Sequence, residues 1–160
     1  MRFRLLSVFL LLPLAAPFSQ ALSAADINLR MDRLSDSLNL LKVEDRSVVD
    51  QALTLIRQGE NAAALAQLST LTKANASNSS VRILTAYALL QAGNVLGAFD
   101  EARKAEASPN GNSYKCWFLA KVALLAGDKT ACRREIKHVE HVGDMAADVK
   151  ALKRELKKSN

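Results

Sequence analysis

The sequence predicts an all-helical protein built from paired helices, and three observations support this fold class. Glycine recurs every 34 residues, and alanine recurs at the same interval seven positions before each glycine. These six positions are Ala52, Gly59, Ala86, Gly93, Ala120 and Gly127. The chain has only 6 glycines and 3 prolines. Strand-like alternation of apolar and polar residues is absent, which favours helices joined by short turns.

The first 24 residues have the composition of a secretory signal peptide. Arg2 and Arg4 form a short positive region, residues 5–18 are almost wholly apolar, and small residues follow up to Ala25. This order is typical of a cleaved export signal. The apolar run is shorter than the ~20 residues of a membrane-spanning helix and contains two prolines, which argues against a retained anchor. We expect residues 1–24 to be removed and the protein to be exported, to the periplasm in a Gram-negative cell and otherwise outside the cell.

The charge of the remaining chain is only mildly positive. Removing Arg2 and Arg4 from the 22 basic residues leaves 20 against 16 acidic residues, a net charge of +4. This excess does not indicate a nucleic-acid partner, and export makes such a partner a poor match. The remaining length is enough for one hydrophobic core.

An amphipathic helix is predicted over residues 26–44. Its apolar residues recur at helical spacing and are Ile27, Met31, Leu34, Leu38 and Leu41. Three placements remain open for this helix. It could cover the first repeat, lie in a binding groove, or pair with a second copy of the chain.

Three repeated units are predicted over residues 45–142, with boundaries at 45–78, 79–112 and 113–142. Each unit has an apolar stripe, then a glycine with Asn or Asp close behind it, then a second apolar stripe. The glycine can take the left-handed conformation that ends a helix, and Asn or Asp suits the start of the next one. Each unit is therefore expected to form two helices with a tight turn between them.

Small residues are expected where the two helices of a unit cross, because they let the helix axes approach closely. The expected facing pairs are Ala52 with Ala64, Ala86 with Ala98, and Ala120 with Cys132.

The period of 34 residues, the small residue at position 8 of each unit and the glycine at position 15 resemble the tetratricopeptide repeat family. The resemblance covers residues 45–142 and implies an α-solenoid of about three tandem helix-turn-helix units. The small residue at position 20 is also present, as Ala64, Ala98 and Cys132. The sequence departs from the family at position 4, where Val48, Arg82 and Cys116 replace the usual aromatic residue. The alternative is a helical bundle without repeats.

In this family the first helices of successive units line a concave surface that binds proteins or peptides. The resemblance implies a groove lined by Arg46, Val49, Leu53 and Arg57 from the first unit, Ile83, Leu84, Tyr87 and Gln91 from the second, and Tyr114, Trp117, Phe118 and Lys121 from the third. Aromatic and Arg side chains are common anchors at protein interfaces. The alternative is that a flanking helix or a second copy buries these aromatic residues.

Cys116 and Cys132, the only cysteines, lie on the two predicted helices of the third unit. A disulfide between them would suit an exported protein. However, Cys132 is expected opposite Ala120, one turn from Cys116, and Cα atoms more than about 7 Å apart cannot be bridged without distortion. Both the bridge and two free thiols remain open.

We predict no metal, cofactor or catalytic site. Cys132, His138 and His141 are residue types that bind metals, but zinc requires four donors in a tetrahedron. Cys116 would have to leave its helix face to become the fourth. The sequence also lacks a nucleophile elbow, an HExxH motif, a phosphate-binding glycine loop and a CxxC pair.

A second amphipathic helix is predicted over residues 143–160, with a basic end. It is expected to cover the last repeat, although its basic end could contact an acidic partner or an anionic membrane surface. The predicted function is that of a non-catalytic, exported scaffold that binds a protein or peptide segment, with no membrane contact beyond the signal peptide. The alternative is a homodimeric structural subunit of an envelope or secreted complex.

Overall fold

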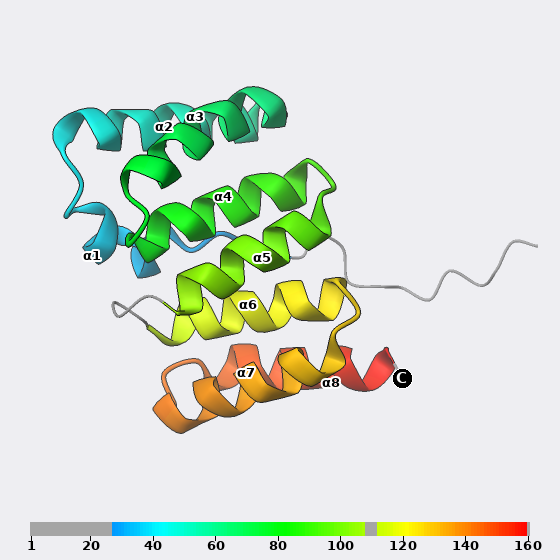
Figure 1. Cartoon of the computed structure of the whole chain (residues 1–160). Helices are drawn as coiled ribbons and strands as arrows, with labels where there is room; N and C mark the ends of the chain where they lie inside the picture. Colours follow the sequence, from blue (N-terminus) through cyan, green and yellow to red (C-terminus); the bar gives the residue numbers. More distant parts are fainter. Residues whose placement is uncertain (1–26, 108–111, 160) are drawn as a thin grey trace, which may run out of the picture.

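The computed structural model describes residues 27–107 and 112–159, and the predicted signal peptide lies outside these ranges. Every regular element within them is helical, which confirms the predicted all-helical class (Figure 1). After a short 3₁₀ turn at Met31–Arg33, the helices are α1 (Ser35–Leu38), α2 (Val43–Arg57), α3 (Asn61–Ala74), α4 (Ser79–Gln91), α5 (Val95–Glu106), α6 (Ser113–Leu125), α7 (Lys129–Val142) and α8 (Ala146–Lys158).

The long helices form three consecutive hairpins. Helix α2 packs on α3, α4 on α5, and α6 on α7, and each hairpin also packs on the next through α3 with α4 and α5 with α6. Figure 1 shows the hairpins as a stack, with α8 beside α7 at the end. Helices α4 and α6 begin at Ser79 and Ser113, where the second and third predicted units begin.

The turns inside the three hairpins share one backbone conformation. Gly59, Gly93 and Gly127 have φ values of 80°, 79° and 80°. The backbone N–H of the residue after each glycine donates to the carbonyl of the residue five positions earlier, at 2.9, 2.8 and 2.9 Å. This pattern is a Schellman motif, which satisfies carbonyl groups left unpaired at the end of a helix. A Cβ atom at these glycines would meet no atom within 4 Å, so the backbone angle rather than crowding requires glycine.

Polar side chains define where four helices begin. The side-chain oxygens of Asn78, Asn94, Asn112 and Asp128 each accept a hydrogen bond from the backbone N–H three residues later, at 3.1, 2.9, 3.2 and 2.8 Å. Such N-caps replace a partner that the first helical turn lacks. Asn61 has a different role, because it lies inside α3 and its Nδ2 donates to the carbonyl of Gln91 at 3.0 Å. That bond joins the first hairpin to the second.

The hydrophobic core continues through the whole stack. Within each hairpin, small residues lie where the two helices cross. The six residues predicted at the helix crossings are all at most 1% exposed, namely Ala52, Ala64, Ala86, Ala98, Ala120 and Cys132. A buried hydrogen bond of 2.8 Å between the hydroxyls of Thr72 and Thr85 adds a polar contact between the first and second hairpins.

The region before the first hairpin differs from the prediction of one amphipathic helix over residues 26–44. Residues 27–30 contain no regular element, and they lead into the 3₁₀ turn and the four-residue helix α1. Side chains from far along the chain bind the backbone of this region. Ser80 donates to the carbonyl of Leu34 at 3.0 Å, and Asn78 donates to that of Ser37 at 2.8 Å.

None of the helices in the described ranges is long and apolar enough to cross a membrane.

Candidate functional site

The predicted groove is partly filled by the chain itself. Residues 27–38, which we call the N-terminal segment, lie against α4 and α6. Ile27 and Leu34 are each 1% exposed, so the segment buries its apolar side chains in the stack. The side-chain amide of Asn112 also donates to the carbonyl of Arg33 at 2.7 Å.

Tyr114 is the centre of this contact. Its hydroxyl accepts a hydrogen bond from the backbone N–H of Arg30 at 3.0 Å and donates one to the carbonyl of Asn28 at 3.3 Å. Its ring stacks on that of Trp117, with the ring centroids 5.5 Å apart. The centroid of the Phe118 ring is 6.2 Å away. Burial raises the pKa of Tyr114 to about 12, against the opposing effect of the hydrogen bond from Arg30. The phenol therefore stays neutral at physiological pH.

Most of the predicted groove residues are not available to a partner. Eight of the twelve are buried within the chain, namely Val49, Leu53, Ile83, Leu84, Tyr114, Trp117, Phe118 and Lys121. These side chains are covered within the chain itself, and the N-terminal segment contributes to this through its hydrogen bonds with Tyr114. Arg46 and Arg57 are exposed and Tyr87 and Gln91 are half-buried, so a groove role for these four stays a prediction.

Charged contacts tie the N-terminal segment and α6 to the end of the stack. Arg30 pairs with Asp148 at 3.3 Å, and Arg33 pairs with Asp144 at 2.8 Å. A hydrogen bond of 2.5 Å from Ser113, with Arg33 adding to it, holds the pKa of the Asp144 carboxyl below its usual value. These contacts hold the N-terminal segment against the end of the stack.

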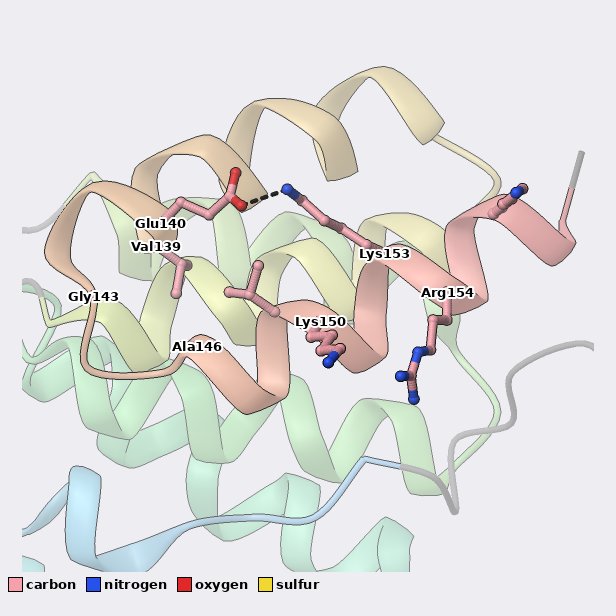
Figure 2. A pocket seen from close by; sticks show the side chains of 9 residues that line it. Val139, Glu140, Gly143, Ala146, Lys150, Lys153 and Arg154 are labelled. Carbon is pink, nitrogen blue, oxygen red and sulfur yellow. Dashed lines mark hydrogen bonds and ion pairs between the residues drawn. The ribbon is translucent and has the colours of Figure 1, made fainter.

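A different surface is open, the cleft between α7 and α8 (Figure 2). Its volume is about 570 Å³. We call it the α7–α8 cleft, and it is lined by Val139, Glu140, Gly143, Ala146, Val149, Lys150, Lys153, Arg154 and Lys157. Gly143 lies in the connection between the two helices with φ 80°, so the chain can reverse direction there.

The α7–α8 cleft combines an apolar floor with a basic wall. Figure 2 shows Val139 of α7 facing α8, and Glu140 bridged to Lys153 by an ion pair. The other bases of the wall, Lys150, Arg154 and Lys157, make no ion pair with any residue that the structure describes. In Figure 2, Lys150 and Arg154 extend from α8 away from the Glu140–Lys153 pair. The cleft can therefore attract carboxylates along its wall while accepting an apolar side chain on its floor.

Both cysteines are free thiols in the structure, so the predicted alternative of a disulfide is not what is observed. Burial raises the pKa of Cys132 to about 11, and that of Cys116 is raised to about 11 by burial and by nearby Glu135. Both sulfurs are therefore protonated at neutral pH, and Cys132 fills the core position that alanine occupies in the first two hairpins.

Sequence reasoning missed the α7–α8 cleft because it gave the helix over residues 143–160 mainly the role of covering the last repeat. The signal was present, because Lys150, Lys153, Arg154 and Lys157 recur at helical spacing beside the apolar stripe that contains Val149. What the sequence could not show is that α7 and α8 leave a hollow beside this stripe, whose own residues Val149 and Leu152 are 4% and 0% exposed. Comparison of the chain with family models, with curated proteins and with solved structures found no match in any of the three.

Proposed function

We propose that this protein is an exported, non-catalytic scaffold of the tetratricopeptide kind that binds an acidic segment of a partner protein. The three hairpins, their equal glycine turns and their 34-residue interval support a solenoid of repeated units. The composition of residues 1–24 supports export. Proteins of stacked helix pairs use extended surfaces for binding, which supports a scaffold role.

The observation that carries the binding proposal is that three bases of the α7–α8 cleft, Lys150, Arg154 and Lys157, have no ion-pair partner among the described residues. Lys150 and Lys157 are two helical turns apart on α8, about 10 Å along the helix axis. A single small anion cannot contact charges spread over that length, whereas a peptide with two or more carboxylates can. Charges of this kind speed association and select partners more than they add to affinity. Val139 and Val149 lie at the bottom of the cleft but are only 1% and 4% exposed, so the aliphatic stems of the basic residues would supply most of the apolar surface for an anchor side chain.

The homodimer alternative was based on the apolar residues of the first predicted helix or on the groove. Ile27, Leu34, Leu38 and Leu41 are all at most 7% exposed, because they pack inside their own chain, and Met31 is half-buried. Their burial argues against this helix as the surface that a second copy would use. The α7–α8 cleft carries an excess of positive charge, which disfavours pairing of this face with its own copy.

Site-specific photo-crosslinking in the exported compartment tests the proposal. A photo-reactive residue at Ala146, an exposed position that lines the cleft, should capture one dominant foreign protein. The matched control is the same residue at Ala62, an exposed alanine in the first turn of α3. The Ala146 crosslink should disappear when Lys150→Glu and Arg154→Glu are combined.

Three results would contradict the proposal. Equal capture from Ala146 and Ala62 would show that the cleft is not selective. Capture that persists when Lys150→Glu and Arg154→Glu are combined would show that the partner segment is not recognised by its acidic charge. Crosslinks only between copies of the chain would support the homodimer in its place.

A further inference from the structure

Three side chains with metal-binding atoms come together where α6 meets α7, away from the α7–α8 cleft. Cys116 belongs to α6, and Glu135 and His138 belong to α7. The Cys116 sulfur, a Glu135 carboxylate oxygen and a His138 ring nitrogen all lie within 4.8 Å of one another. None of the three lines the cleft.

The fold explains the convergence of these side chains. Glu135 and His138 are three residues apart, so they lie on one face of α7. His138 Nδ1 and Glu135 Oε2 are 3.4 Å apart. Helices α6 and α7 form the third hairpin, and their antiparallel packing brings the first turns of α6 beside the last turns of α7.

Glu135 is the unusual member of the cluster, because it is 0% exposed. Its Oε1 accepts a hydrogen bond from Arg134 Nε at 2.7 Å, but its buried Oε2 accepts none. A buried carboxylate oxygen without a hydrogen bond is costly, and natural proteins retain few of them. The Oε2 atom is directed toward His138, at the position where a cation would satisfy it.

We propose that Cys116, Glu135 and His138 form a binding site for Zn²⁺ or a chemically similar divalent transition-metal ion. Thiolate, imidazole and carboxylate are the donor types that zinc takes in proteins. Donor atoms around a tetrahedral zinc lie about 3.3–3.7 Å apart, so distances in the cluster must contract by up to about 1.5 Å. The His138 side chain is 54% exposed, which leaves it room to turn. A water molecule takes the fourth position.

The charges around the sulfur favour a cation. The carboxylates of Glu135 and Glu106 place negative charge near the Cys116 sulfur, against the positive charge of Lys115. The Lys115 ammonium donates to the carbonyl of Ala105 at 3.0 Å. A divalent ion replaces the thiol proton on binding, so the thiolate and the Glu135 carboxylate together balance its charge.

This donor set differs from the one considered in the sequence. Among the described residues, Cys132 and His141 do not join the cluster. Glu135 was not a candidate, because nothing in its charged local sequence indicates that it becomes fully buried. The two residues outside the cluster provide matched controls, one cysteine and one histidine of the same hairpin.

Titration of the reduced, purified protein with Co²⁺ tests the site. The expected result is one bound ion per chain, with a sulfur-to-cobalt charge-transfer band and the strong visible absorption of tetrahedral cobalt. Added Zn²⁺ should displace the cobalt and raise the Tm of the protein. Cys116→Ala should abolish the charge-transfer band, and His138→Ala should weaken Zn²⁺ binding by more than about tenfold.

The controls separate this site from adventitious binding. Cys132→Ala and His141→Ala should leave both the cobalt spectrum and the zinc-induced Tm shift unchanged. Glu135→Gln should also weaken metal binding. If this substitution of a buried residue impairs folding, His138→Ala still tests the site, because the His138 side chain is exposed. Absence of a charge-transfer band in the wild type would overturn the proposal. An unchanged affinity in His138→Ala would overturn it too, leaving the Glu135–His138 contact as an ion pair only.

Discussion

The ammonium group of Lys121 contacts both carboxylate oxygens of Glu155, at 2.9 and 2.7 Å, and thereby joins α6 to α8. Lys121 is only 6% exposed and also lies 5.8 Å from the centre of the Trp117 ring, whereas Glu155 is 31% exposed. The two members of this ion pair therefore have unequal access to water, and the consequences of losing them differ.

Glu155→Ala should destabilise the protein more than Lys121→Met does. Loss of the carboxylate leaves a buried ammonium without its counter-ion, which costs up to about 3 kcal/mol. Methionine fills a volume similar to that of lysine, and water can hydrate the Glu155 carboxylate that remains. Urea denaturation of both variants measures the difference in the free energy of unfolding, and the double variant should be no less stable than Glu155→Ala. Equal losses for the two single variants would contradict this asymmetry.

Gly59→Ala should cost about 1–2 kcal/mol of stability, because an L-residue pays that much in the left-handed conformation. The φ value is 80° and a Cβ atom there meets nothing within 4 Å, so the backbone is the only source of strain. Gly59→Asn is the matched control and should cost less, since Asn tolerates this region better. Thermal unfolding of the two variants checks the order, and a larger loss for Asn would point to a steric cause.

Stability should fall at alkaline pH in a way that depends on Tyr114. Its pKa is raised to about 12 in the folded state, so the folded protein holds this proton more tightly than the unfolded chain does. The neutral phenol stabilises the folded state fully below about pH 10. This stabilisation, on the order of 2 kcal/mol, is lost as pH rises to about 12. Denaturation across this range should show a smaller pH-dependent loss in Tyr114→Phe.

One control accompanies this measurement. The half-buried thiol of Cys116 and the buried thiol of Cys132 also have raised pKa values of about 11, so the stability that they contribute begins to be lost at lower pH. Measuring both proteins in a Cys116→Ala background removes the part of the alkaline loss that comes from this thiol. An identical alkaline profile for wild type and Tyr114→Phe would show that the phenol is not held neutral.

At neutral pH, loss of the Tyr114 hydroxyl should cost about 1 kcal/mol of stability, since it removes the hydrogen bond from the Arg30 backbone N–H.

Cys132→Ala should be tolerated, with a loss of about 1 kcal/mol for the buried sulfur. Alanine occupies the corresponding positions 64 and 98 of the first two hairpins, where it is 0% exposed. Cys132→Leu should cost about 1–3 kcal/mol, because the extra carbons must enter a filled helix crossing. Calorimetry of the two variants measures both values, and a tolerated leucine would show that the crossing is loosely packed.

The sequence predicted the helix pairs well because their determinants are local. Glycine at residues 59, 93 and 127 takes the positive φ that ends a helix. Asn94 and Asp128 cap the next helix by accepting a hydrogen bond from the backbone N–H three residues later. The small residues of each crossing are also separated by a fixed interval. Interactions of this range can be recognised from spacing alone.

The N-terminal segment and the binding surface were not predictable in the same way. The place of the segment depends on Asn78, Ser80 and Tyr114, which lie far along the chain and bind its backbone. The position of Tyr114 on α6 indicates the side of the helix it occupies, but only the folded chain shows that the segment covers that side. Burial of Glu135 likewise depends on how α6 and α7 meet.

The ion pairs from Arg30 to Asp148 and from Arg33 to Asp144 link residues before the first hairpin to the connection and helix after the last one. In an array where each unit touches only its neighbours, the ends can fray and unfolding can proceed unit by unit. Here the N-terminal segment contacts the middle and the end of the stack at once. We expect this chain to unfold in a single cooperative transition, with amide hydrogens of α2 and α8 exchanging together rather than in sequence.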